Sequence, residues 1–477
     1  MTENKIQFIL NNQLTELTFA ENLNSTTTLL QYLRNNTPFK GVKEGCAEGD
    51  CGACTVVISE FIDNSFQYKA VDSCLIFLPM LHGLSVYTVE FIETLYSDQY
   101  HPVQEALIAH NGSQCGFCTP GFTMSMFALH QQDSQADRNK IEDALSGNLC
   151  RCTGYQSIIE ACLSDVFKNK NQQIEVLEQE QKILLESINT KESIVIKNLN
   201  QEYFKCFKKE EALLYLDKYP DTLILNGSTD VSLAVTKRHE HLQRILDISS
   251  VNELKKLVLS DEWIKIGAGV SLEKLKNFSE NRLPILFQNL TVFASKQIRE
   301  MGTIGGNVGS SSPISDLLPV LMVLEAELKL QSIKSDRLVN INDYVLGYRK
   351  TLRNQNELIT KIHIPVPKIG VIHQFYKVSK RKDMDISTLS AAFELKLNGI
   401  LVENIKICFG GMDAVAIRVH LIENFLIGKT WERNNIEQAQ LLLDDIFNPI
   451  SDARSSAEFR MIAAKNLLLK FWSENIV

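Results

Sequence analysis

Alternating hydrophobic and polar residues predict a small β-sheet unit from the start of the chain to about residue 92. Segments 6–10 and 14–19 flank Asn11-Asn12-Gln13, which is typical of a hairpin turn. Helical spacing follows at 27–34, and further strands are expected at 53–58 and 84–89. From about residue 91 the period becomes helical, and four helices are predicted at 103–110, 119–130, 138–145 and 155–167.

The second half of the chain mixes short strands with helices. Residues 168–193 are polar and charge-rich and are expected to form a linker, with a helix between 174 and 188. Asn398-Gly399 lies between two strand-like segments and predicts a hairpin, and two amphipathic helices follow at 436–446 and 455–472. We therefore expect an α+β multidomain protein with units at 1–92, 93–168, 169–193 (the linker), 194–367 and 368–477.

Composition narrows the class of protein. The 477 residues are 44% hydrophobic and 22% charged, which supports sizeable cores and argues against a disordered chain. A formal charge of -8 without a basic block makes nucleic acid an unexpected partner. No secretory signal is apparent, and the most apolar run, 317–324, is too short to span a membrane. We expect a soluble, cytoplasmic protein.

Eight of the eleven cysteines lie before residue 153, in two groups of four. In the first group Cys46, Cys51 and Cys54 have the spacing C-x4-C-x2-C, and Cys74 follows. This is the plant-type ferredoxin spacing for a [2Fe–2S] cluster held by four thiolates. Four glycines between residues 41 and 52 would let the loop wrap closely around the sulfurs. The alternative is a structural zinc site, which normally uses C-x2-C pairs.

The second group precedes two predicted helices, and its members are Cys115, Cys118, Cys150 and Cys152. Thiolates at helix N-termini are stabilised by the helix dipole and have lowered pKa values. Two such helix ends could enclose a small anionic cluster, although the spacing alone leaves zinc as an alternative. The remaining cysteines are isolated and are expected to be buried as small hydrophobic residues: Cys162, Cys206 and Cys408.

Two stretches in the middle of the chain combine glycines with small polar residues. The first follows a predicted strand at 223–225, and the second runs from 299 to 309. The chain contains neither GxGxxG after a strand nor a Walker sequence, so no Rossmann or P-loop fold is predicted. These stretches could turn N–H donors toward a diphosphate, whereas a tight turn without a ligand is the simpler interpretation.

Three motifs closely resemble the iron–sulfur half of the xanthine dehydrogenase and aldehyde oxidase family of molybdenum hydroxylases: GCAEGDCGACTV, GSQCGFCTPGF and SGNLCRCTGY. The resemblance implies a plant-type ferredoxin-like β-grasp domain, an all-helical [2Fe–2S] domain, an FAD-binding domain of the vanillyl-alcohol-oxidase-like type and an α+β C-terminal flavoprotein domain. It further implies that all eight clustered cysteines bind iron and that Gln114 and Cys152 approach a pterin.

In the same family the two glycine-containing stretches bind FAD. By this resemblance, Phe293 would contact the flavin and Asp316 a polar part of FAD. Asn226 stands where bacterial relatives often have glycine, which leaves the exact loop geometry open. Segment 377–386 resembles the region near the flavin and nicotinamide pocket, with a solvated charged loop as the alternative. The residues that would hold the diphosphate are Leu225, Asn226, Gly227, Ser228, Thr229, Asp230, Val231, Thr303, Ile304, Gly305, Gly306 and Asn307.

The resemblance implies the electron-transferring subunit of a xanthine dehydrogenase. Because the molybdopterin-binding segment of the single-chain enzymes does not follow, a separate molybdopterin-binding large subunit is expected, in a dimer of heterodimers. Electrons from hypoxanthine or xanthine would pass through two [2Fe–2S] clusters to FAD and then to NAD+. No catalytic residue is expected in this chain. The alternatives are another molybdenum hydroxylase, acting on an aldehyde or N-heterocycle, and a zinc-scaffolded interaction protein without redox chemistry.

Overall fold

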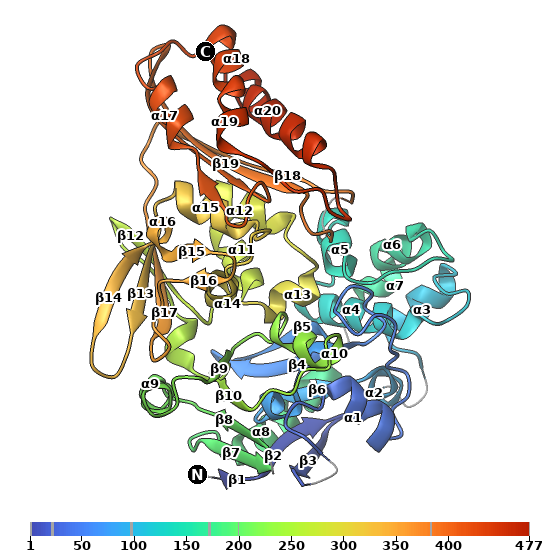
Figure 1. Cartoon of the computed structure of the whole chain (residues 1–477). Coiled ribbons are helices and arrows are strands. Elements are labelled where there is room, and N and C mark those ends of the chain that lie inside the picture. Colours follow the sequence, from blue (N-terminus) through green and yellow to red (C-terminus); the bar gives the residue numbers. More distant parts are fainter. Residues whose placement is uncertain are drawn as a thin grey trace. The chain divides into compact units, whose positions relative to one another are not determined.

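The computed structural model describes residues 2–20, 23–95, 99–169, 173–198, 200–381 and 384–476, and the chain forms two compact units (Figure 1). The first unit comprises Met1–Ala212, Asp221–Val251 and Ser295–Gly302. The second unit comprises Leu213–Pro220, Asn252–Ala294 and Thr303–Val477. In the described part of the chain, no helix is long and apolar enough to cross a membrane.

The first unit begins with a five-stranded sheet in the order β3-β2-β6-β4-β5, in which β2 and β6 are parallel. Asn11 and Asn12 both have positive φ, as a two-residue hairpin turn requires, so the predicted hairpin is confirmed. A capping box between Thr28 and Gln31 starts the helix that covers the sheet. These elements are β2 (Lys5–Leu10), β3 (Gln13–Thr18), α1 (Leu29–Asn36), β4 (Thr55–Ile62), β5 (Ser65–Asp72) and β6 (Ser85–Tyr87).

A helical region follows, and its apolar faces enclose a separate core around Phe122, Met126 and Ile158. The predicted helix at 155–167 is interrupted at Ser164, whose side chain caps a new helix by accepting the N–H of Phe167. The other predicted helices of this region are confirmed. The helices are α2 (Val89–Thr94), α3 (Pro102–Ala109), α4 (Thr119–Gln132), α5 (Arg138–Leu145), α6 (Gln156–Leu163) and α7 (Asp165–Lys168).

The predicted linker contains α8 (Gln173–Ser187), which packs on the first sheet. Gln181 of this helix is fully buried and accepts a hydrogen bond from Tyr87, and Glu178 accepts one from Tyr68. A second sheet then forms in the order β1-β7-β8-β10-β9. Its elements, with the helices that accompany it, are β1 (Thr2–Glu3), β7 (Ile194–Asn198), β8 (Gln201–Lys205), α9 (Lys209–Lys218), β9 (Leu223–Leu225), α10 (Val231–Thr236), β10 (Arg244–Asp247) and α13 (Lys296–Met301).

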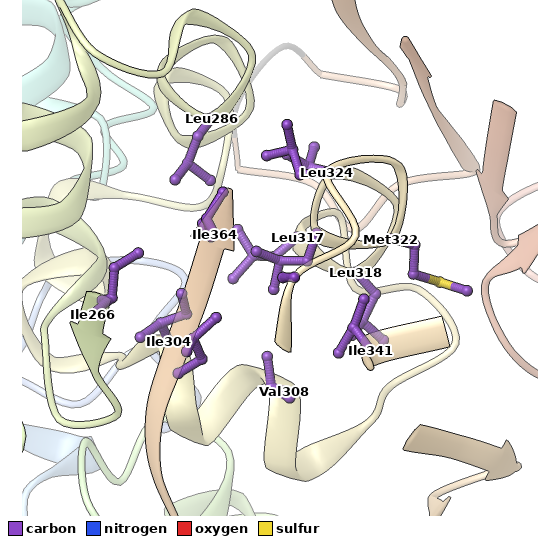
Figure 2. Packing of buried hydrophobic residues seen from close by; sticks show 14 of the residues in the cluster. Ile266, Leu286, Ile304, Val308, Leu317, Leu318, Met322, Leu324, Ile341 and Ile364 are labelled. Atoms are coloured by element: carbon purple, nitrogen blue, oxygen red, sulfur yellow. The ribbon is translucent and has the colours of Figure 1, made fainter. Parts of the chain in front are cut away.

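The second unit contains an antiparallel sheet in the order β11-β12-β17-β13-β14. Most of the apolar run at 317–324 forms α15, whose side chains share one hydrophobic core with Ile266, Ile304 and Ile364 (Figure 2). The elements are β11 (Leu257–Leu259), β12 (Trp263–Gly267), α11 (Leu272–Ser279), α12 (Pro284–Thr291), α14 (Ile304–Ser310), α15 (Leu317–Val323), β13 (Glu327–Gln331), β14 (Asp336–Asn340), α16 (Ile341–Tyr344), β15 (Val345–Gly347), β16 (Lys350–Thr351) and β17 (Leu358–Pro365).

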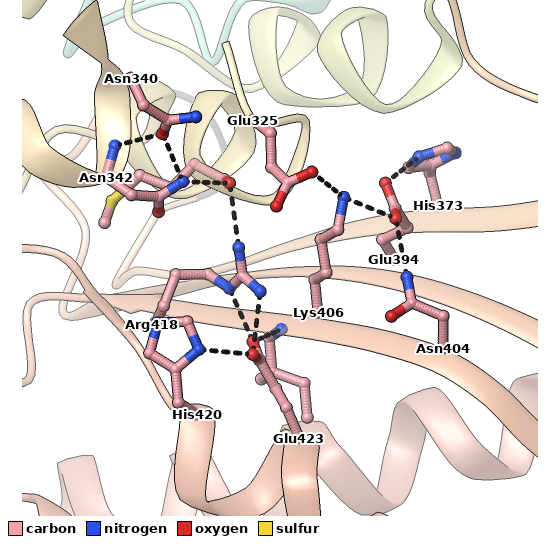
Figure 3. Close-up of polar contacts among 12 residues, drawn as sticks. Glu325, Asn340, Asn342, His373, Glu394, Asn404, Lys406, Arg418, His420 and Glu423 are labelled. Carbon is pink, nitrogen blue, oxygen red and sulfur yellow. Dashed lines mark hydrogen bonds and ion pairs between the residues drawn. The ribbon is translucent and has the colours of Figure 1, made fainter. Parts of the chain in front are cut away.

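The same unit ends in a four-stranded sheet covered by helices. The predicted hairpin is confirmed, although the two turn residues are Gly399 and Ile400, shifted by one from the prediction. Lys406 joins this sheet to the end of α15 by pairing with both Glu325 and Glu394 (Figure 3). The elements are β18 (Val371–Val378), β19 (Leu389–Asn398), β20 (Leu401–Gly410), β21 (Ile417–Arg418), α17 (His420–Leu426), α18 (Arg433–Leu441), α19 (Leu443–Ile446) and α20 (Ala457–Glu474).

Candidate cofactor sites

The first cysteine group lies on a loop that wraps around its own sulfur atoms. The sulfur of Cys46 accepts the backbone N–H groups of Glu48 at 3.4 Å and Asp50 at 3.3 Å. Such a reversal of the chain needs left-handed backbone, which Gly49 and Gly52 adopt with φ of +83° and +65°. The loop therefore provides the N–H donors that an anionic cluster requires.

The thiols of each group are arranged in pairs. Cys54 and Cys74 have sulfur atoms 3.4 Å apart, and the sulfurs of Cys115 and Cys152 are 3.5 Å apart. Two thiolates on one tetrahedral metal, each about 2.3 Å from it, would lie about 3.8 Å apart. Within the described ranges, no three His, Cys, Asp or Glu side chains are placed to hold one metal ion. Each of these two pairs is close to the spacing of two thiolates that share one metal ion, which is the arrangement at each iron of a [2Fe–2S] cluster.

The pKa values of the thiols follow from the same contacts. Hydrogen bonding from Cys51 lowers the pKa of Cys46 to about 5, although burial acts in the opposite direction. The backbone N–H of Phe117 is the main cause of the lowered pKa of Cys115. Both shifts favour the thiolate form, which is the form that binds metal.

The second cysteine group precedes two helices, as predicted. Cys118 is the N-cap residue of α4, and α6 begins directly after Tyr155. The hydroxyl of Thr153 donates to the sulfur of Cys150 at 3.2 Å. Cys150 is buried, whereas Cys115 and Cys152 are exposed, so one side of this group faces the surface of the first unit.

A backbone hydrogen bond joins the two cysteine groups. The N–H of Leu149 donates to the carbonyl oxygen of Cys51 at 3.0 Å, and Leu149 directly precedes Cys150. The side chain of Asn148 also donates to the carbonyl oxygen of Gly52, at 3.1 Å. Asn148 was not predicted as a functional residue. The only feature of the sequence that could have indicated it is the presence of an amide side chain within the cysteine motif at 146–155.

The two stretches expected to hold a diphosphate belong to different units. In the first unit, 225–231 begins at the last residue of β9, and its backbone approaches α13 so closely that a Cβ at Gly227 would overlap the carbonyl oxygen of Met301. Ser228 has a φ of 66°, and its hydroxyl is hydrogen-bonded to that of Ser232 at 2.5 Å. This turn is thus tight and polar, and larger side chains are excluded from it.

In the second unit, residues 303–307 form the start of α14. The hydroxyl of Thr303 caps this helix by accepting the N–H of Gly306 at 3.1 Å. Ile304 is buried in the hydrophobic core, so its side chain has a packing role. The side chain of Asn307 accepts a hydrogen bond from Ser315 at 2.6 Å.

Asp316 is the centre of a buried polar network in the second unit. One carboxylate oxygen accepts from Ser387 at 2.6 Å, and the other lies 3.1 Å from the ammonium group of Lys377. Lys377 also donates to the carbonyl oxygen of Val292, next to Phe293, at 2.8 Å. Both oxygens of Asp316 thus have protein partners, so Asp316 orients Lys377. In the predicted charged segment at 377–386, residues 382 and 383 lie outside the described residues.

Four family models match the chain in succession. They are a 2Fe-2S iron-sulfur cluster binding domain at 14–77 and a [2Fe-2S] binding domain at 88–163, followed by an FAD binding domain in molybdopterin dehydrogenase at 198–367 and a CO dehydrogenase flavoprotein C-terminal domain at 374–475. These matches confirm the predicted fold class and support FAD and [2Fe–2S] clusters as the cofactors.

Several characterised proteins are similar to the chain. It is 29% identical, over 99% of its length, to the xanthine dehydrogenase/oxidase of Rattus norvegicus, of which it spans 39%. Reconstituted CO dehydrogenase from Oligotropha carboxidovorans is 26% identical with a TM-score of 0.54, over 58% of this chain and 96% of that chain. Quinoline 2-oxidoreductase from Pseudomonas putida 86, 23% identical with a TM-score of 0.54 over 58% of this chain and 97% of that one, shares the fold. The four domains, in this order, fit the FAD and [2Fe–2S] subunit of the molybdenum hydroxylase family.

Proposed function

We propose that this chain is the electron-transferring subunit of a xanthine dehydrogenase. Its partner is a molybdopterin-binding large subunit that oxidises hypoxanthine or xanthine, and NAD+ accepts the electrons. When bound, the iron–sulfur clusters carry single electrons, and FAD exchanges electrons singly or in pairs. The domains of this proposal are the units predicted from the sequence, at 1–92, 93–168, 194–367 and 368–477, with a linker at 169–193.

The hydrogen bond from Leu149 to Cys51 is the observation that carries the proposal. It connects the carbonyl group of Cys51 to the peptide that precedes Cys150, so a single backbone hydrogen bond bridges the two cysteine groups. A protein that only used metal for folding would have no need of such proximity between its sites. Electron transfer between two clusters does need it.

The chain's own residues have three tasks in this proposal. The eight clustered cysteines hold the iron, and the N–H groups directed at Cys46 stabilise the negative charge of the first cluster. Residues 225–231 and 303–307, with Phe293 and Asp316, hold FAD; the tight turn at Gly227 supports this assignment. The exposed Cys115 and Cys152 support the second cluster as the one that faces the molybdenum partner.

Chain organisation supports the proposed substrate. Relatives named xanthine dehydrogenase align with 99% of this chain in rat and 93% in Oryza sativa. The CO dehydrogenase chain aligns with 58% of it. Cluster and flavin domains on one chain therefore favour a xanthine dehydrogenase over the alternative, a molybdenum hydroxylase for another substrate.

The first experiment is anaerobic purification of the chain, with iron, sulfide, zinc and flavin counted for each chain. We expect about four irons and one FAD, with visible absorbance that dithionite bleaches. Zinc without a chromophore would overturn the redox proposal. Adding NADH tests the acceptor, because bleaching by NADH supports NAD+ and bleaching by dithionite alone argues against it.

The substrate needs the complete enzyme. The chain should be isolated with its partner and supplied with hypoxanthine, an aldehyde and an N-heterocycle in separate reactions. We expect urate and NADH to form from hypoxanthine. Turnover of only the aldehyde or the heterocycle would assign the chain to a different molybdenum hydroxylase.

A further inference from the structure

Asn148 occupies a buried position at which every hydrogen-bonding group of its side chain is used. The amide nitrogen donates to the carbonyl oxygen of Gly52 and to the hydroxyl of Thr55, each at 3.1 Å. The amide oxygen accepts from Ser125 at 2.6 Å and from Gln297 at 3.0 Å. An amide can make two donor and two acceptor bonds of this kind, so Asn148 is fully satisfied with only 2% of its surface exposed.

The four partners come from distant parts of the chain. Gly52 and Thr55 flank Cys54 on the first cysteine loop, Ser125 belongs to α4, and Gln297 belongs to α13. All of them lie in the first unit. Asn148 thus ties the loop of the first cysteine group and α13 to the segment that carries Cys150.

The backbones around Asn148 approach each other as closely as glycine allows. A Cβ at Gly52 would overlap the Asn148 side chain, and a Cβ at Gly121 would overlap the carbonyl oxygen of Gly52. Close packing alone would resist compression but would not set the relative rotation of the two loops. Directional hydrogen bonds to a planar amide do set it.

We propose that Asn148 is a positioning residue that fixes the distance and orientation between the two cysteine groups, and thereby the electronic coupling of the clusters they hold. The proposal rests on the assignment of [2Fe–2S] clusters to both groups. Electron exchange and magnetic interaction between two centres both fall steeply with separation. A small shift between the loops would therefore change both properties, while each cluster keeps its own four thiolates.

The test compares Asn148→Ala with Gln181→Ala in the full anaerobically purified chain. Gln181 is a matched control because it is also a fully buried amide of the first unit, hydrogen-bonded to Tyr87 and not to a cysteine loop. Both variants should lose stability. Only Asn148→Ala should change the spin–spin splitting between the two reduced clusters in the electron paramagnetic resonance spectrum.

Amide hydrogen exchange supplies a readout that does not depend on the clusters. In Asn148→Ala, the N–H of Leu149 should exchange at least about tenfold faster, as expected from the loss of a buried hydrogen bond nearby. In Gln181→Ala this exchange should stay at the wild-type rate. Unchanged splitting and unchanged exchange in Asn148→Ala, with four irons retained, would overturn the inference.

Two further variants apply if Asn148→Ala does not retain iron. Ser125→Ala removes one bond to Asn148, and Asn148→Asp keeps the size but places an oxygen opposite the carbonyl of Gly52. Both should shift the splitting, and wild-type splitting in both would reject the inference. If the wild-type chain shows no [2Fe–2S] signals at all, it is the proposed function that fails, so the two failures are distinct.

Discussion

Gly121 packs directly against Gly52, and this contact brings helix α4 onto the loop of the first cysteine group. A Cβ at position 121 would overlap the carbonyl oxygen of Gly52. That oxygen is already shared by Asn148 and Thr55, so it has no room to move aside. The start of α4, which carries Cys118 at its N-cap, thus depends on the absence of a side chain at one position.

We expect Gly121→Ala to destabilise the protein by about 1–3 kcal/mol through overpacking. The direction of this change in the free energy of unfolding is informative, because alanine is preferred to glycine in a helix by about 1 kcal/mol when nothing obstructs its side chain. Thermal unfolding would measure the change. Gly347→Ala is the control, since a Cβ there meets nothing within 4 Å, and it should unfold within about 0.5 kcal/mol of wild type. A stabilised Gly121→Ala variant would contradict the close contact.

Removal of single cysteines should remove iron from one group at a time. We expect Cys54→Ser and Cys150→Ser each to retain about two of four irons, because each group holds its own cluster. Iron analysis and electron paramagnetic resonance would identify the cluster that remains. Cys162→Ala should retain all the iron, since this thiol is buried in the core of the helical region. Iron lost from both groups in either serine variant would argue against independent clusters.

The ion pair between Arg299 and Asp143 is another link between α13 and the helical region. Arg299 is almost fully buried and donates to Asp143 at 2.6 Å. Asp143→Asn should cost about 2 kcal/mol in the free energy of unfolding, because it removes the negative charge that accepts a hydrogen bond from the buried Arg299 guanidinium. Denaturant unfolding measures this change. The control is Asp165→Asn, which alters an exposed pair with Lys168 and should cost less than about 1 kcal/mol.

Acid stability should depend on His101. Burial is the main cause of the lowered pKa of this imidazole, which is about 3 in the folded chain. The unfolded chain takes up the proton near pH 6.5. The contribution of the neutral imidazole to the free energy of unfolding is therefore complete above that pH and is lost as the pH falls toward 3. The variant His101→Asn can still cap α3. We expect its free energy of unfolding to fall less steeply than that of the wild type as the pH is lowered from about 6.5 to 3. Equal slopes in the two proteins would exclude His101 as the cause.

Flavin binding should be sensitive to Gly227. In Gly227→Ala the new Cβ would overlap the carbonyl oxygen of Met301, so the turn after β9 must move. We expect a chain with its iron intact and substantially less FAD, measured by absorbance after gel filtration. A wild-type flavin content would show that residues 225–231 do not hold the cofactor.

Local features were accessible from the sequence because each depends on residues close together in the chain. The hairpin at Asn11-Asn12 requires two positive φ values, which asparagine tolerates. The first cysteine group was recognisable by its spacing, whereas the second was assigned to a cluster by resemblance. The helix after Cys118 begins where predicted, and the helix after Tyr155 begins one residue later than predicted. The break at Ser164 escaped prediction because a cap in the middle of a periodic segment competes with continuation of the helix.

The sequence by itself determined the elements, the two groups of thiols and the resemblance that joins them to flavin domains. Only the tertiary structure decided how the groups are held together. Gln297 and Asn148 are 149 residues apart in the chain, and their hydrogen bond exists because α13 packs beside β5 and α5. Spacing rules describe residues within a few turns of one another. A bond between distant segments depends on the packing of the whole core, which no local pattern encodes.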